Sequence, residues 1–153
     1  MREFVDAMQF SRFLNQHIAM SSPVLDSTVE LMAKNIHRKV RENFGNLDKL
    51  QELKPATIDR KSKMGFSDPS APLVASGELR DSMELYHEGH EAGVGTEDMK
   101  MVYHEYGTMD KGGHNPPRPV LQISIDETTK ENQEAFKAGV AEALGVSIRR
   151  TLF

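Results

Sequence analysis

An apolar stripe with helical spacing runs through residues 25–44 and constrains the fold more than any other feature of the chain. Its members recur at steps of three and four residues, which places them on one face of a helix. They are Leu25, Val29, Met32, Ile36, Val40 and Phe44. Ser21-Ser22-Pro23 precedes the stripe and is typical of a helix start, while Gly45-Asn46 follows it and is typical of a helix end. The sequence therefore predicts an amphipathic helix over about 23–44 that needs a partner for its apolar face.

Short alternating segments further along the chain predict that partner as an antiparallel sheet. Residues 83–87 alternate as in a half-buried strand, and residues 88–91 have the composition of a turn. Residues 92–96 predict a second strand, with glycines where two backbones approach closely. Residues 101–106 predict a third strand. Together they indicate an antiparallel meander.

A last helix is predicted over about residues 124–144. Its Asp126–Glu134 part is polar nearly all round, so we expect that part to project into solvent or to face a polar neighbour. The fold class expected from these elements is α+β. An antiparallel sheet of three to four strands is packed by an N-terminal amphipathic helix and a C-terminal helix.

The length of 153 residues suits one main domain. Residues 1–20 are apolar and predict an N-terminal arm or helix, which packs on its own domain or docks on a neighbour. Residues 21–145 predict a single α+β domain, with a long irregular insertion at about 46–75 that prolines and a glycine interrupt. Residues 146–153 are interpreted as a C-terminal tail.

Composition excludes several classes of protein. The net charge of −4 argues against a dedicated nucleic-acid binder, which usually presents a basic face. The absence of cysteine excludes disulfides and thiolate metal sites. No apolar run approaches the roughly 18 residues that a membrane-spanning helix requires, so no membrane association is expected.

The candidates for chemistry are His87, His90, His104 and Glu105, which invite a metal-site hypothesis. His87 and His90 lie three residues apart across a predicted turn, whereas the zinc-protease motif needs histidines four apart on one helix face. Surface histidines are the simpler interpretation. No Gly-x-Ser-x-Gly nucleophile elbow occurs either. We therefore expect no enzyme activity, no metal and no cofactor.

Arg118 differs from these candidates because Pro117 and Pro119 restrict the backbone on both sides of it. A long cation on a stiff segment suits a carboxylate contact with another subunit, and an intrachain salt bridge is an equally good interpretation. Tyr103 and Tyr106 lie on opposite faces of the predicted third strand, so at most one belongs to the core. The other is a candidate aromatic anchor at an interface.

Four short cassettes occur in one order along the centre of the chain: Pro72–Ser82, Val94–Thr96, Tyr103–Thr108 and Pro117–Leu121. In this order, with the upstream Leu53–Ile58 segment, they resemble the tail-completion or neck proteins of long-tailed bacteriophages. That broad group is also described as virion-morphogenesis or minor tail proteins. The resemblance covers roughly residues 20–145.

The resemblance implies a structural virion protein rather than an enzyme. Proteins of this group form a homo-oligomeric ring, by analogy a hexamer, at the junction of capsid connector and tail. The partners implied are the connector or head-completion protein on one side and the tail terminator or tail tube protein on the other. Genome DNA passes through the ring without sequence-specific binding. The implied location is the neck or tail of the virion, after assembly in the host cytoplasm.

The loop after the third predicted strand, and the segments beside it, form the predicted interface with a subunit or partner. Its residues are Tyr103, Tyr106, Gly107, Lys111, His114, Pro117, Arg118 and Pro119. Two other functions stay open at this point. One is a metal-dependent hydrolase that uses the His87, His90 and His104 cluster. The other is a small regulator that binds a host protein.

Overall fold

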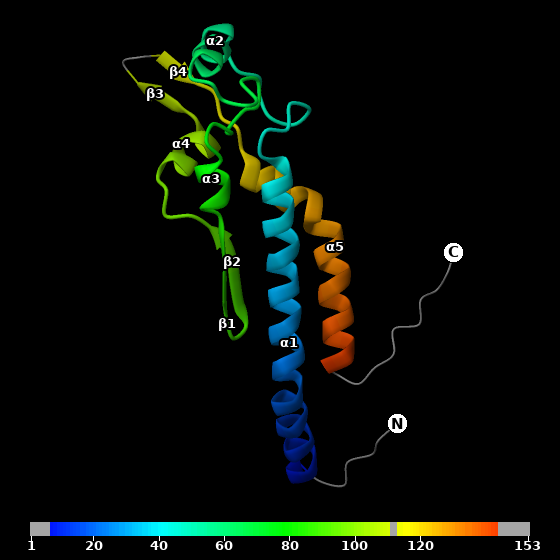
Figure 1. Ribbon diagram of the computed structural model, residues 1–153. Coiled ribbons are helices and arrows are strands. Elements are labelled where there is room, and N and C mark those ends of the chain that lie inside the picture. The colour runs from blue at the N-terminus through cyan, green and yellow to red at the C-terminus, as the bar shows by residue number, and fades with distance from the viewer. Residues whose placement is uncertain (1–6, 111–112, 144–153) are drawn as a thin grey trace, which may run out of the picture.

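Two long antiparallel helices form the frame of the molecule. The computed structural model describes the backbone of residues 7–110 and 113–143 and the side chains of residues 23–108 and 115–143. Helix α1 spans Ala7–Asn43 and helix α5 spans Val120–Ala143. Figure 1 shows the two helices side by side, with α1 extending past the end of α5. Most of the other elements lie at the end where α1 finishes and α5 begins.

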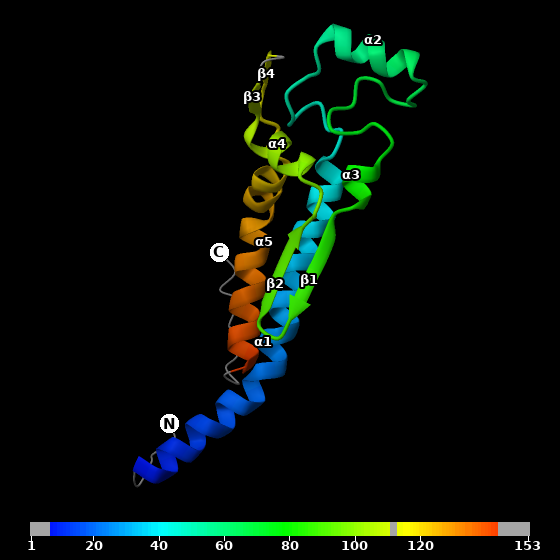
Figure 2. The same ribbon diagram turned by 90° about the vertical axis from the view of Figure 1, so that its left-hand side faces the viewer.

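Helix α1 ends as predicted and begins earlier than predicted. It continues through Pro23, so the Ser21-Ser22-Pro23 segment is not a helix start. Proline removes one helical hydrogen bond and typically bends a helix without ending it, and Figure 2 shows α1 bending in its first part. At the other end the φ of Gly45 is 79°, in the left-handed region that glycine adopts readily.

The contact between α1 and α5 is largely polar. The Asn35 side chain donates to that of Asn132 at 3.0 Å, and the Asn43 amide donates to the Ser124 hydroxyl at 3.0 Å. Thr128 is 1% exposed on the same face of α5. Of the two alternatives predicted for the Asp126–Glu134 part, the side that packs on α1 faces a polar neighbour, and the other sides face solvent. Helix α5 also begins four residues earlier than predicted.

A β-hairpin packs against α1. Strands β1 (Glu84–Glu88) and β2 (Glu91–Gly95) pair antiparallel through a two-residue turn that begins at Gly89, where φ is 56°. This confirms the two predicted strands and their turn. The reason given for the β2 glycines is wrong, because a Cβ added at Gly93 or Gly95 would meet no atom within 4 Å.

The segment predicted as a third strand is instead helix α4, Lys100–Tyr106. Asp98 starts it, since its carboxylate accepts from the Lys100 backbone N–H at 2.9 Å and its carbonyl accepts from the Met101 N–H. Met101 and Glu105 are buried and lie four residues apart, so they share one helix face. The six-residue run was too short for its period to separate helix from strand.

The sheet of three to four strands is not found among the described residues. A second pair, β3 (Thr108–Asp110) with β4 (Gly113–Asn115), forms its own two-stranded antiparallel sheet. The fold is therefore mixed helix and strand, with a helix at each end of the described chain and two separate hairpins.

The segment predicted as an irregular insertion contains one regular element, helix α2 (Pro55–Lys63), which begins at proline as helices often do. Lys61 organises the loop that follows. It is 7% exposed, and its ammonium donates to the carbonyls of Ala71 at 2.7 Å and Val74 at 2.6 Å. The short helix α3 (Glu78–Asp81) comes next, and the Ser76 hydroxyl accepts from the Glu78 N–H at 3.4 Å.

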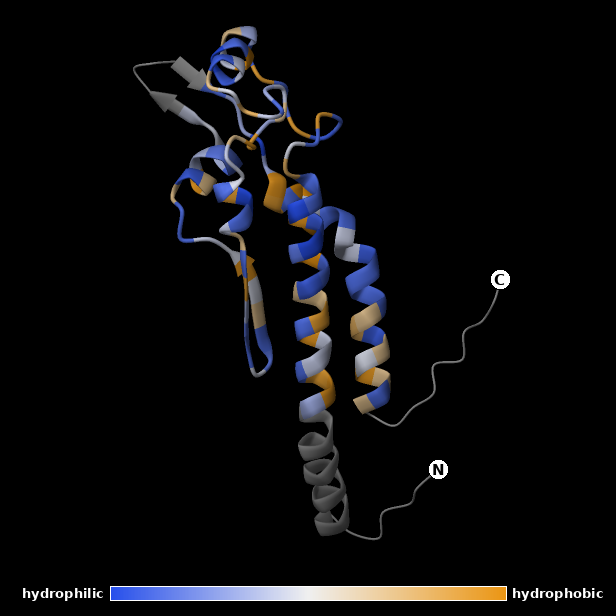
Figure 3. Cartoon of the chain, in the orientation of Figure 1, coloured by the Kyte–Doolittle hydropathy of each residue, from blue (hydrophilic) through white to orange (hydrophobic). Residues whose placement is uncertain are grey.

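The hydrophobic core lies where the end of α1, the start of α5 and the short helices α3 and α4 meet. Figure 3 shows hydrophobic residues at the start of α5 beside the end of α1, and further ones at intervals along α1. The buried cluster consists of Val40, Phe44, Leu50, Leu79, Met83, Met101 and Val120. Within the part of the chain described, no helix is both long and apolar enough to cross a membrane.

Candidate functional site

Helix α4 presents an apolar face to solvent. Met99 directly precedes the helix, and with Val102, Tyr103 and Tyr106 it follows the spacing i, i+3, i+4, i+7, which forms one stripe on a helix. The four side chains are 61%, 45%, 54% and 80% exposed. We call these four residues the α4 stripe. Because α4 is a helix, both tyrosines are exposed, whereas the strand prediction left one for the core.

Two contacts hold α4 in place beneath its stripe. Met101 belongs to the core cluster. The Glu105 carboxylate accepts from the backbone N–H groups of Leu121 at 3.1 Å and Gln122 at 2.9 Å, so it satisfies free donors at the start of α5. These contacts fix the position of α4, and a binding surface is more precise when it lies on a rigid element.

Arg118 is buried and is neither an interface cation nor half of a salt bridge. It is 7% exposed, and its guanidinium donates to the carbonyls of Gln51 at 2.7 Å and Glu52 at 3.0 Å. Its own backbone N–H donates to the His104 carbonyl at 2.6 Å. Burial lowers the pKa of the guanidinium from its ordinary value. No carboxylate among the described residues forms an ion pair with it, so Arg118 ties the chain after α1 to the start of α5.

Gly107 has a structural task at the end of α4. Its φ is 74°, and a Cβ there would lie 2.7 Å from the Asn115 carbonyl oxygen and 3.0 Å from the Pro117 nitrogen. Only glycine fits this close approach. Pro117 is exposed and Pro119 is half-buried. Lys111 lies outside the described residues, and of His114 only the backbone, paired with Met109, is described.

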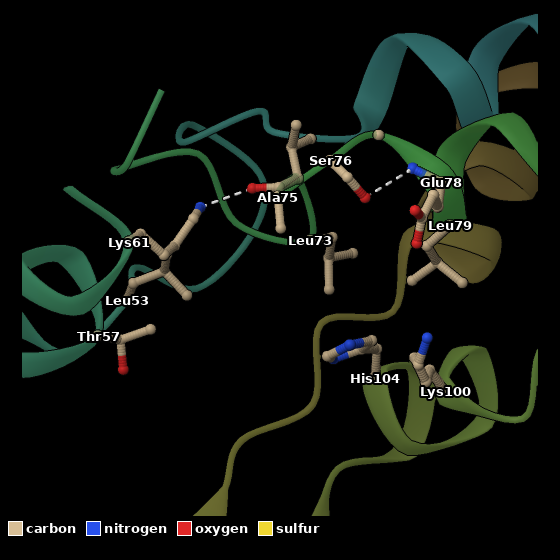
Figure 4. A pocket seen from close by; sticks show the side chains of 12 residues that line it. Leu53, Thr57, Lys61, Leu73, Ala75, Ser76, Glu78, Leu79, Lys100 and His104 are labelled. Atoms are coloured by element: carbon tan, nitrogen blue, oxygen red, sulfur yellow. Dashed lines mark hydrogen bonds between the residues drawn. The ribbon is translucent and has the colours of Figure 1, made fainter. Parts of the chain in front are cut away.

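A pocket of about 270 Å³ lies between α2, the loop before α3, and α4. Figure 4 shows the His104 ring and Lys100 across the pocket from Leu73 and Leu79. Burial, and secondarily the charge of Arg118, lower the pKa of His104, which favours its neutral form. Leu73 has a φ of 63°, rare for a side chain of its size. The lining combines apolar side chains with the His104 imidazole and with the polar side chains of Thr57, Lys61, Ser76, Glu78 and Lys100, and no nucleophile in it is hydrogen-bonded to a side-chain base.

The histidines of the metal hypothesis lie on different elements. The His87 imidazole is 3.0 Å from an Asp26 carboxylate oxygen on α1, and His104 lies in α4. Glu105 is committed to the backbone of α5. Among the side chains that the structure describes, those of residues 23–108 and 115–143, no three histidine, aspartate or glutamate groups are placed so that they could hold a metal ion.

Sequence reasoning found the two tyrosines and missed the other half of the α4 stripe. Met99 and Val102 stand at helical spacing with Tyr103 and Tyr106, a signal that was present but assigned to a strand. The open edge of β2 was not predicted from the sequence either, because a sheet of three to four strands was expected, in which a third strand follows β2. Comparison of the chain with protein-family models, with curated proteins and with solved structures found no match.

Proposed function

We propose that this chain is a structural subunit of the head–tail junction of a long-tailed bacteriophage. Copies assemble into a ring, by analogy a hexamer, that joins the capsid connector to the tail around the DNA path. The observation that carries the proposal is the α4 stripe of Met99, Val102, Tyr103 and Tyr106, exposed on a well-supported helix. The ordered cassettes that resemble neck proteins supply the type of assembly.

The α4 stripe has the composition of a protein interface. Aromatic residues and methionine are enriched at interface cores, and tyrosine contributes a large contact area with little loss of side-chain freedom. A free surface helix normally turns its apolar side inward and its charged side outward. Because α4 does the reverse over most of its exposed face, it is expected to bury that face against another protein.

Charge is compatible with a channel around DNA. A net charge of −4 gives little overall attraction for phosphate, so the genome passes without tight binding. The proposed neighbours of the ring are the connector or head-completion protein and the tail terminator or tail tube protein.

The test is complementation of a phage that lacks this gene with the double variant Tyr103→Ser/Tyr106→Ser. We expect the variant to fold, to be missing from purified particles, and to leave heads and tails unjoined. The matched control is Leu47→Ser, which changes an apolar side chain that is 47% exposed in the loop after α1, outside the stripe. The proposal fails if wild-type protein is absent from purified virions and heads join tails normally without it.

A further inference from the structure

One edge of the β1–β2 hairpin is open. A two-residue hairpin closes on a hydrogen-bonded pair, here Glu88 with Glu91, so alternate residues of β2 direct their backbone groups toward β1. The N–H and C=O groups of Ala92 and Val94 consequently point to the other side. No strand of the described chain pairs with that side. The edge also lacks the lysine or proline that commonly protects an exposed strand.

An apolar groove of about 390 Å³ runs along α1 and α5 on the same side as this edge. Its walls include Ile36 from α1 and the side chains of Ile125 and Phe136 from α5, which are 43% and 50% exposed. Ile36 follows Asn35, which contacts α5, and precedes His37, which contacts the Met83 carbonyl before β1. At about 100° per residue, Ile36 lies on the face of α1 between α5 and the hairpin.

Figure 2 shows β2 on the α5 side of β1, so the open edge is turned toward the side of α1 on which Ile36 lines this groove. A strand added to β2 would turn alternate side chains toward α1 and the groove, and the remaining ones outward. The outward face of the hairpin is acidic, because Glu84, Glu88 and Glu91 are all exposed there. The site therefore suits an extended segment with apolar residues at alternate positions and basic residues among the others.

We propose that residues 144–153 of a neighbouring copy fill this site as a third strand beside β2. This segment lies outside the described residues, and residues 146–149 have the required pattern. Val146 and Ile148 alternate with Ser147 and Arg149, and the whole segment contains no acidic residue. Arg150 falls at an alternate position with Val146 and Ile148, at the end of this pattern. Backbone hydrogen bonds to the edge supply affinity, and the groove and the glutamates supply specificity.

This mode of joining suits a ring. The donated segment and the accepting edge are different parts of the same chain, so each copy gives to one neighbour and receives from the other. The inference rests on the homo-oligomer of the proposed function, but it does not depend on the place of that oligomer in a virion.

Amide hydrogen exchange on the full chain tests the accepting edge. On raising the protein concentration into the range where oligomers form, exchange at Ala92 and Val94 is expected to slow roughly five- to tenfold, as a new hydrogen bond requires. Ala92→Pro removes an outward N–H and should abolish the oligomer, whereas Ala92→Ser keeps that N–H and should retain it. A synthetic peptide of residues 144–153, added in excess, should dissociate the oligomer while protecting the same two amides.

If Ala92→Pro misfolds, variants of the donated segment, residues 144–153, provide a second test. Val146→Ser/Ile148→Ser should reduce the sedimenting mass to that of a monomer, and Ser147→Ala should not. Unchanged mass in the first variant overturns the proposal. So does protection of Ala92 and Val94 that is the same at every concentration, since the segment would then belong to its own chain. A wild-type monomer that does not bind the peptide also overturns it.

The two proposals fail separately. A ring with protected β2 amides that is absent from virions keeps this inference and removes the head–tail function. A protein that is present in virions, but whose β2 amides stay unprotected in the ring, keeps the head–tail function and removes this inference.

Discussion

Arg118 shows how the surroundings of one residue reverse its expected role. Its neighbours Pro117 and Pro119 indicated a projecting cation, yet the side chain turns inward and bonds to the carbonyls of Gln51 and Glu52. Burial of the guanidinium charge costs solvation free energy, and its hydrogen bonds to the two carbonyls offset that cost. Sequence identifies the stiff segment but not the direction of the side chain, because the carbonyls that receive it come from 66 and 67 residues earlier.

Replacement of this arginine should therefore weaken the isolated subunit. Arg118→Met keeps much of the side-chain volume and removes both donors, so we expect the free energy of unfolding to fall by about 2 kcal/mol. Urea unfolding of the purified chain measures this. Arg60→Met, at an exposed position of α2, is the control and should change stability by less than about 0.5 kcal/mol. Equal effects of the two substitutions would show that the carbonyl contacts contribute little.

Among the elements, the pairing of α1 with α5 depends on one small residue. Gly139 is buried, and a Cβ there would collide with the Thr28 hydroxyl and lie 2.9 Å from the Thr28 Cγ2. The two helices approach closely at this point, and the polar residues further along bond across the same contact. A helix-interior glycine is otherwise unfavourable by about 1 kcal/mol relative to alanine, so close packing is the reason it fits.

We expect Gly139→Ala to destabilise the chain despite the better helix propensity of alanine. Overpacking commonly costs about 1–3 kcal/mol, which exceeds the gain of about 1 kcal/mol from propensity. In a Thr28→Ala background the hydroxyl and the Cγ2 are gone and only the Cβ remains, 3.0 Å from the added methyl group, so the same substitution should destabilise much less. Denaturant unfolding of the four proteins in this double-mutant cycle measures the difference. A stabilising effect in both backgrounds would mean that the helices separate easily.

The elements also show what the sequence could predict. The end of α1 and the hairpin of β1 and β2 were predictable, because their glycines and alternating residues act locally. Helix α4 was not predictable in this way, because the apolar residues of so short a run fit the spacing of a strand as well as that of a helix. The Asp98 carboxylate, which accepts from the Lys100 N–H, favours the helix by capping its start. At most one of the two tyrosines was expected in the core, and the helix exposes both of them and forms the stripe.

At the scale of the whole molecule, the buried apolar side chains are gathered mainly in one cluster. The buried cluster, which joins Val40 and Phe44 of α1 to Val120 of α5, lies at one end, and further along the two helices contact each other through asparagine, serine and threonine. Polar pairs fix the register of two helices but add less net stability than apolar burial. The α4 stripe and the groove beside β2 are left open in a single copy, so association is expected to supply stability that one subunit lacks.

Thermal unfolding should consequently depend on protein concentration. If folded copies associate and unfolded ones do not, mass action raises the unfolding temperature as concentration increases. We expect a clear rise over about a hundredfold range of concentration, measured by calorimetry, since that range corresponds to about 2.7 kcal/mol for a simple binding step. Tyr103→Ser/Tyr106→Ser should flatten the dependence, and Leu47→Ser, an exposed apolar position outside the stripe, should preserve it. An unfolding temperature that is constant over the whole range would mean that the open surfaces serve a different protein.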